Sequence, residues 1–186
     1  TAGIAALTTN QVSKGLTTDQ VAALTTAGAG ALTTGGIAAL TTDQVVALRT
    51  DQVAALKTNQ VAALSTDGIA AMETSDIAAM TTAGVGALTT NQVSKGLTTD
   101  QIVALRTDQV AALKTGQVAS LTTDQVAAME TRDIAALTSA NIAALSTDQV
   151  SKGLTTSQVS AMTTAGVTAL STSGVASLTT DQVVAL

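Results

Sequence analysis

A single eight-residue unit repeats along the whole chain, and this repeat limits the possible folds more than any other feature. The unit reads Thr-Thr-Asp-Gln-Val-Ala-Ala-Leu, as in residues 17–24. A partial unit over residues 1–7 is followed by 22 units, three of which have nine residues. No residue is left for a linker, so we expect one continuous tandem-repeat solenoid over 1–186, in which each octad packs on its neighbours.

Comparison of the octads shows which of their positions are constrained. The second position is Thr in every octad but one, which has Ser139; the fifth is Val or Ile except at Ala29; the last is Leu or Met. The first and third positions vary among polar and charged residues, which is typical of a surface exposed to solvent. A spacing of three residues between the fixed positions indicates one face of a short helix.

A continuous helix is excluded, because eight residues make ~2.2 turns and the apolar stripe would rotate by ~80° per octad. The helix must therefore break once in each octad. Thr is a favoured N-cap, and Gln three positions later completes a capping box, as Thr17 and Gln20 do. The second Thr is the other candidate cap, and its near invariance favours it. The sequence predicts an all-α solenoid of very short Thr-capped helices, one per octad, with Leu and Val or Ile inside.

The alternative fold is a β-solenoid with two octads per coil. Val, Ile and Thr favour strands, and Gly at the fourth position suits turns. Strands require a period of two, however, and the fixed positions two, five and eight alternate in parity. Ala, Gln and Leu also favour helix, so the helical solenoid is preferred. With two octads per coil and layers about 10 Å apart, the array would be a rod of about 110 Å.

The octads are grouped into larger blocks. Residues 41–97 and 98–154 are matching blocks of 57 residues, and both end in a nine-residue unit. The three nine-residue units contain the same insert, which lies at Ser13-Lys14-Gly15, Ser94-Lys95-Gly96 and Ser151-Lys152-Gly153. We interpret each insert as a helix that is extended by one residue and ended by Gly.

The composition excludes several classes of function. The chain has no His, which serine–histidine catalysis requires, and no Cys for disulfides or thiolate metal sites. Its net charge of −5 argues against nucleic-acid binding, and no apolar run approaches the ~18 residues of a membrane span. We expect no enzyme, no catalytic or metal-binding residue and no cofactor.

Four patterns remain as candidate sites. Adjacent Ser and Lys, as in Ser13-Lys14, do not face each other on a helix. Asp at the third position suits the helix dipole, and the glycine- and aspartate-rich pattern of calcium-binding repeats is missing. Rows of Thr resemble the surface of some ice-binding proteins, but Arg, Lys and Glu interrupt them. Met replaces Leu as a core residue in four octads, at Met72, Met80, Met129 and Met162.

The string Leu-Thr-Thr-x-Gln-Val-Ala-Ala-Leu resembles the octapeptide arrays of very long bacterial adhesin-like, haem-utilisation and surface proteins. This resemblance covers the whole chain and implies an extracellular or cell-surface structural element, with no site residues to transfer. Thr1 falls inside a repeat, so we expect a segment of a longer protein whose ends are covered by flanking sequence or by other copies in a filament. Contacts between neighbouring rods through Arg49, Lys57 and Glu73 are a further expectation.

Overall fold

The computed structural model describes all 186 residues, and it contains helices and no strand. The predicted all-α fold is therefore confirmed, and the β-solenoid alternative is wrong. Two compact parts are distinguished, an N-terminal part over Thr1–Leu97 and a C-terminal part over Thr98–Leu186. The boundary between them follows the second nine-residue unit, where the first 57-residue block ends.

Each octad contributes one helix of four to six residues, and each nine-residue unit contributes a π-helix of five. The N-terminal part contains α1 (Ala2–Ala5), η1 (Gln11–Gly15), α2 (Thr18–Ala22), α3 (Thr26–Ala29), α4 (Thr34–Ala38), α5 (Thr42–Val46), α6 (Thr50–Ala54), α7 (Thr58–Val61), α8 (Thr66–Ala71), α9 (Thr74–Ala79), α10 (Thr82–Val85) and η2 (Gln92–Gly96). The C-terminal part contains α11 (Thr99–Ala104), α12 (Thr107–Ala111), α13 (Thr115–Ser120), α14 (Thr123–Ala128), α15 (Thr131–Ala136), α16 (Ser139–Ala143), η3 (Gln149–Gly153), α17 (Thr156–Ser160), α18 (Thr164–Ala169), α19 (Thr172–Ser177) and α20 (Thr180–Ala185).

The break between helices lies at the last residue of one octad and the first of the next. Thr17 has the extended conformation of an N-cap, with φ −79° and ψ 163°, and its side chain accepts a hydrogen bond from the Gln20 N–H at 3.2 Å. Gln20 Oε1 in turn accepts from the Thr17 N–H at 3.0 Å, which completes the predicted capping box. The first Thr is thus the cap, which decides between the two candidates that the sequence leaves open. Near invariance of the second Thr does not reflect capping, because Thr18 is already the first helical residue and is exposed.

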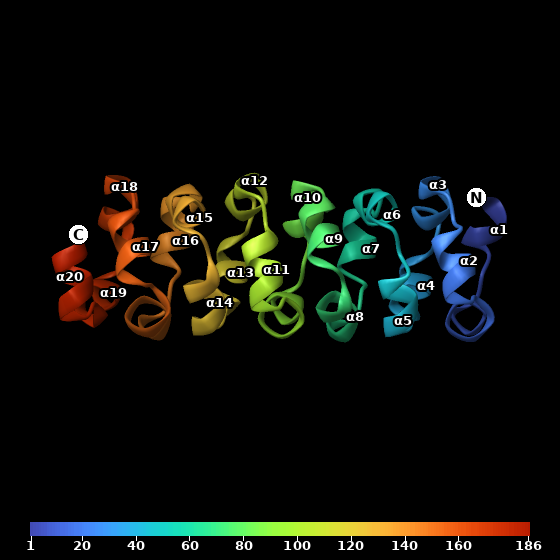
Figure 1. Cartoon of the computed structure of the whole chain (residues 1–186), viewed down its shortest axis with the longest axis horizontal. Coiled ribbons are helices and arrows are strands. Elements are labelled where there is room, and N and C mark those ends of the chain that lie inside the picture. Colours follow the sequence, from blue (N-terminus) through green and yellow to red (C-terminus); the bar gives the residue numbers. More distant parts are fainter. The chain divides into compact units, whose positions relative to one another are not determined.

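Three octads make one coil of the solenoid in each part. In the N-terminal part, α5 packs on α2 and α8, and α6 packs on α3 and α9. In the C-terminal part, α15 packs on α12 and α17, again three octads away on each side. Figure 1 shows this one-helix-per-octad arrangement along the blue-to-green segment of the N-terminal part. The estimate of two octads per coil is therefore wrong. Two extended residues separate successive helices, and the chain passes through three of these breaks before a helix packs on an earlier one.

The core consists of the fourth, fifth and last residues of the octads. Ile69 and Val150 are fully buried fifth residues, and Leu105 is a last residue with only 1% of its surface exposed. Met72, Met80 and Met129 are buried in place of Leu, as predicted, whereas Met162 is half-buried. Because the chain lacks aromatic residues, these small aliphatic side chains supply all of the apolar burial.

The nine-residue units accommodate their extra residue by a wider helical turn. Leu154 N–H donates to the Gln149 carbonyl five residues earlier at 2.9 Å, and Leu97 does the same to Gln92. The predicted extension by one residue is confirmed. Gly does not end the helix in the left-handed conformation, however, because no Gly in the chain has a positive φ.

Gly153 is required for close packing instead. A Cβ placed on Gly153 would lie 3.1 Å from Val126 Cβ and 3.3 Å from the Thr123 carbonyl oxygen of α14. We expect Gly153→Ala to cost about 1–2 kcal/mol, because overpacking outweighs the helix propensity that Ala gains. Gly15 is the matched control, because its Cβ would meet only Gln11 Cβ, at 3.8 Å. Chemical denaturation should show Gly15→Ala to be neutral or stabilising, and equal losses at both sites would refute the packing role.

Candidate functional site

The most regular polar feature of the interior is a row of Gln side chains at the fourth position of the octad. Gln149 is 2% exposed, and its Oε1 accepts from the Ser146 N–H at 2.8 Å. Its Nε2 donates to the carbonyl oxygens of Val118 and Leu121 at 2.9 and 2.7 Å. One amide therefore caps the start of its own helix and also binds the end of α13, 28 to 31 residues earlier.

The same two-sided contact recurs in both parts of the chain. The buried amides with this geometry include Gln44, Gln52, Gln60, Gln92, Gln149, Gln158 and Gln182. We name this set the Gln row. Asn141 has a shorter side chain, and its Nδ2 still reaches the Leu113 carbonyl at 2.9 Å. The sequence predicts the capping half of this contact but not the half that joins successive coils.

Asp replaces Gln at this position in two octads that lie 57 residues apart, at Asp76 and Asp133. Both carboxyls are buried, at 2% and 0% exposed. Thr107 Oγ1 donates to Asp133 Oδ1 at 2.8 Å, and Thr50 donates to Asp76 in the same way. Burial raises the pKa of both carboxyls, and the Thr hydroxyl only partly opposes this effect.

The Ser hydroxyls of the three Ser–Lys pairs are bonded to the backbone of their own helices. The hydroxyls of Ser13, Ser94 and Ser151 donate to backbone carbonyls four residues earlier, at 3.0, 2.9 and 2.8 Å. Lys152 forms an ion pair with Asp148 at 2.7 Å. These contacts orient the side chains along the surface of the π-helices and bring no second reactive group to the hydroxyl.

Arg49, one of the residues expected to contact a neighbouring rod, is engaged within its own chain. Its guanidinium pairs with Asp51 at 3.0 Å and donates to the carbonyls of Ala22 and Leu24 at the end of α2. The hydrogen bond from Arg49 lowers the pKa of Asp51. Glu73 accepts from Ser75 at 3.3 Å, and Lys57 is exposed. Gln52 from the same octad also donates to the Leu24 carbonyl. Arg49 therefore adds an exposed contact to the buried contact that Gln52 makes with the end of α2.

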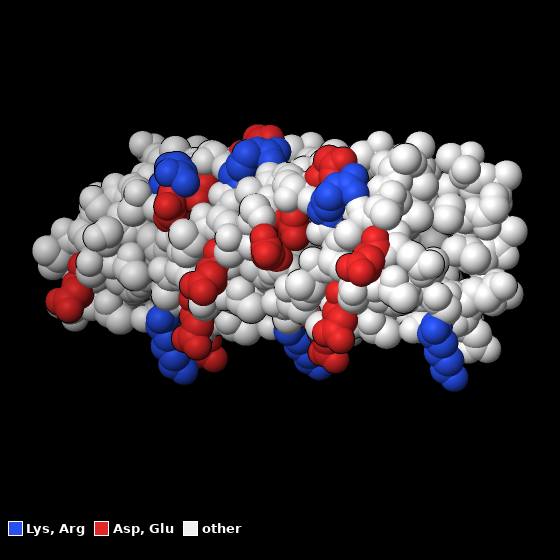
Figure 2. Space-filling view, turned by 45° about the vertical axis from the view of Figure 1, so that its right-hand side comes forward, with Lys and Arg blue, Asp and Glu red and all other residues white.

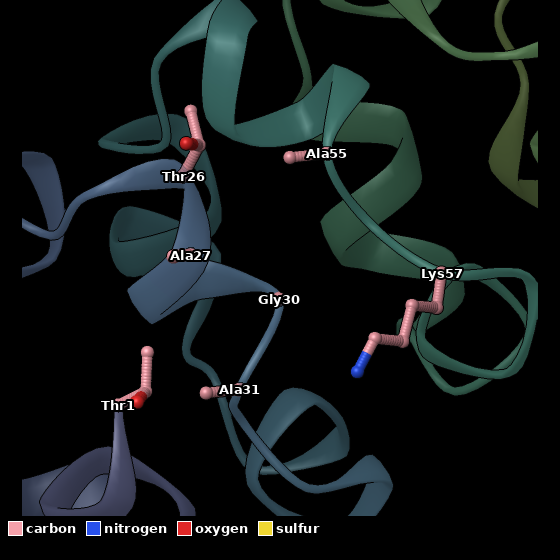
Figure 3. Close-up of a pocket in the computed structure, with 7 residues that line it drawn as sticks. All are labelled: Thr1, Thr26, Ala27, Gly30, Ala31, Ala55 and Lys57. Carbon is pink, nitrogen blue, oxygen red and sulfur yellow. The ribbon is translucent and has the colours of Figure 1, made fainter.

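A shallow hollow of about 500 Å³ lies in the N-terminal part. It is bordered by Thr1, Thr26, Gly30 and Ala55 and by the Lys57 side chain, which extends toward it in Figure 3. Apart from Lys57 its walls are methyl groups, hydroxyls and backbone. No group of three His, Cys, Asp or Glu side chains is placed to hold a metal ion anywhere in the chain.

Charged residues form small separate groups on the face drawn in Figure 2, and most of that surface is uncharged. Acidic and basic side chains lie beside one another in several of these groups. One ion pair of the chain joins Arg106 to Asp108 at 3.0 Å. None of the helices combines the length and the apolar character that crossing a membrane requires.

The comparisons with known proteins agree with the repeat geometry. The family model of the ALTTAQ repeat matches residues 30–58, 69–107, 95–123, 104–129, 126–164 and 153–186. The motif in its description corresponds to segments such as Ala39-Leu40-Thr41-Thr42-Asp43-Gln44, in which the cap and the buried amide are both present. Comparison with curated protein sequences gives no match. The matches cover most of the chain, which is a structural repeat protein and belongs to the ALTTAQ repeat family.

Proposed function

We propose that this chain is a structural segment of a bacterial extracellular stalk or filament, in which coils of octads stack end to end and no reaction is catalysed. The extracellular or cell-surface location rests on the resemblance to the octapeptide arrays of bacterial surface proteins. The observation that supports the filament is the stacking surface of the coils, which at α19 and α20 presents the side chains of a buried coil to a further coil of octads.

Apolar side chains at this surface are exposed to an extent not seen inside the array. Val183 is 53% exposed and Val175 is 52% exposed, whereas Val150, at the same position of its octad, is fully buried. Gln11 and Gln20 are complementary to that surface, because they make the capping contacts and their Nε2 groups can donate to the carbonyls of a further coil. A further coil of octads, from the same chain or from a second copy, has the carbonyls and apolar side chains that fit these surfaces. Between two copies, such a contact is heterologous and does not close, so it generates a filament.

A charge on the open coil tests this proposal. We expect the purified chain to form species that lengthen with concentration in sedimentation velocity and electron micrographs. Val183→Asp should abolish them, because it places a carboxylate in the apolar contact. Val46→Asp is the matched control, because Val46 is 46% exposed on the side of a coil, and it should assemble normally. A chain that stays monomeric at high concentration, or equal loss in both variants, would overturn the filament.

Ice binding through the Thr rows is the alternative function. In most of the octads that begin with two Thr residues both are exposed, and their hydroxyls give the regular spacing that such a surface needs. Against it, many first-position hydroxyls accept from helix N–H groups, and Arg49, Lys57 and Glu73 interrupt the row. Thermal hysteresis of the purified chain decides between the two, and none at millimolar concentration would remove ice binding.

A further inference from the structure

The buried Asp133 carboxyl is the one interior polar group whose hydrogen bonding is incomplete. Its Oδ1 accepts from Thr107 Oγ1 at 2.8 Å, whereas its Oδ2 is buried and meets no hydrogen-bond donor. A buried carboxylate oxygen without a donor is costly, because it loses its hydration and gains nothing in exchange. A protonated carboxyl removes this cost if its hydroxyl finds an acceptor.

The Gln row shows where that acceptor lies. In the octads of the Gln row the amide at the fourth position donates to the carbonyl of the last residue of an octad in the preceding coil, and Asn141 reaches Leu113, 28 residues earlier. Asp has the same side-chain length as Asn. The residue 28 positions before Asp133 is Leu105, the buried C-cap of α11. By analogy with Asn141, the Leu105 carbonyl is the acceptor expected for an O–H on Oδ2.

Few charges surround the Asp133 carboxyl. On its own helix, Glu130 raises the pKa of Asp133 and Arg132, whose Nε is 3.9 Å from Oδ1, lowers it, but burial is the largest influence and raises it. Arg132 is also paired with Glu130. The helices packed against α15 are α12 and α17. The charged residues of α12 and its cap are Arg106 and Asp108, which pair with each other, and α17 has none.

We propose that Asp133 forms a pH-sensitive contact, here called the joint, between α15 and the preceding coil. When it is protonated, Oδ2 donates a hydrogen bond to the Leu105 carbonyl and holds α15 against that coil. When it is ionised, its negative charge faces the carbonyl oxygen and weakens the contact. A buried Asp at the same octad position recurs 57 residues earlier, where Thr50 forms a side-chain hydrogen bond with Asp76 of α9. There the neighbouring charges are Glu73 at the cap of α9 and Arg49 and Asp51 on α6. Each 57-residue block thus carries one buried Asp at this position.

The direction of the pH effect follows from the raised pKa of the folded state. Below the ordinary Asp value of 3.8 the carboxyl is protonated in both the folded and the unfolded chain, and the stability of the joint is fully present. Stability is lost as pH rises from 3.8 through the pKa of the folded state. Acid therefore strengthens this joint, in contrast to an ion pair such as that of Arg49 with Asp51, which acid weakens.

The variant Asp133→Asn tests the joint, because its amide donates at every pH. At pH 7 we expect Asp133→Asn to melt about 5 °C above the unchanged chain, and at pH 4 the difference should shrink toward zero. Asn141→Asp is the reciprocal variant, and it should melt below the unchanged chain at pH 7 with a loss that diminishes at pH 4. Each variant is compared with the unchanged chain at the same pH and differs from it at one residue. The effect of pH on the other acidic residues is therefore the same in both proteins and cancels in the difference between their melting temperatures.

A direct readout separates the joint from a purely structural effect. The ¹³C carboxyl resonance of Asp133, assigned by its absence in Asp133→Asn, should titrate with a midpoint above 3.8. A midpoint at or below 3.8 would overturn the proposal. So would an Asp133→Asn variant that is less stable than the unchanged chain at pH 7, or a difference that does not change between pH 7 and pH 4.

Discussion

Replacing Gln149 by Glu is expected to destabilise the C-terminal part by about 3 kcal/mol or more at pH 7. Glu has the shape of Gln and retains the oxygen that accepts from the Ser146 N–H. It cannot donate, so its second oxygen faces the carbonyls of Val118 and Leu121 at the distances that the amide now occupies. The Glu carboxylate would be buried, and the carbonyl oxygens of Val118 and Leu121 would lose their donor. Both the charge and the two carbonyls would then be without water and without a hydrogen-bond partner, which lowers the free energy of unfolding.

Gln20→Glu is the matched control. Gln20 makes the same capping box with Thr17 but is exposed and binds no carbonyl of another coil. An acidic residue at this position suits the helix N-terminus, so we expect a change within about 0.5 kcal/mol. Urea denaturation followed by circular dichroism measures both variants. Similar losses in the two would show that capping, and not the contact between coils, is the role of the Gln row.

The second large effect is expected from the apolar core. Leu145→Ala removes most of a side chain that is 5% exposed, and it should cost about 2–5 kcal/mol. The high end of that range applies where neighbouring residues cannot move into the cavity that the truncated side chain leaves. Here the neighbouring octads are held in place by their N-caps and by the amides of the Gln row. An octad supplies at most one Val or Ile and one Leu or Met to the interior, so no other large side chain fills the space.

Leu186→Ala serves as the comparison for Leu145→Ala. Leu186 holds the same position of the octad but is 55% exposed, so its truncation should cost less than about 1 kcal/mol in the monomer. The measurement is again urea denaturation, at a protein concentration low enough to avoid assembly. If Leu145→Ala were as mild as Leu186→Ala, the last residues of the octads would not form a packed core.

The sequence predicts the helices, the break in each octad and the apolar core for physical reasons that act locally. A cap such as Thr17 and its partner Gln20 lie three residues apart, so their relation is visible in a single octad. The burial of Gln149 is not visible, because its donors find their acceptors about 30 residues away. Polar residues are usually exposed, and a fourth position that mixes Gln, Gly, Asp and Asn has the variety of a surface.

The number of octads per coil also cannot be predicted from the sequence of one octad. It depends on how far the two extended residues between helices turn the chain, and similar sequence patterns suit coils of two or three. The role of Gly153 is hidden for a related reason. Its constraint comes from Val126 and the Thr123 carbonyl of α14, which lie 27 and 30 residues earlier, and not from its own backbone conformation.

The three-octad coil is tested most directly by a pair of engineered cysteines. A Cβ on Gly68 would lie 3.8 Å from Val45 Cβ, which is the usual separation of about 3.8 Å across a disulfide. The chain has no Cys of its own, so a double variant contains only the two introduced thiols. A coil of two octads would instead bring Val45 beside residue 60. The structure predicts that Val45→Cys with Gly68→Cys oxidises to an intramolecular disulfide and that Val45→Cys with Gln60→Cys keeps two free thiols, and the reverse result would contradict it.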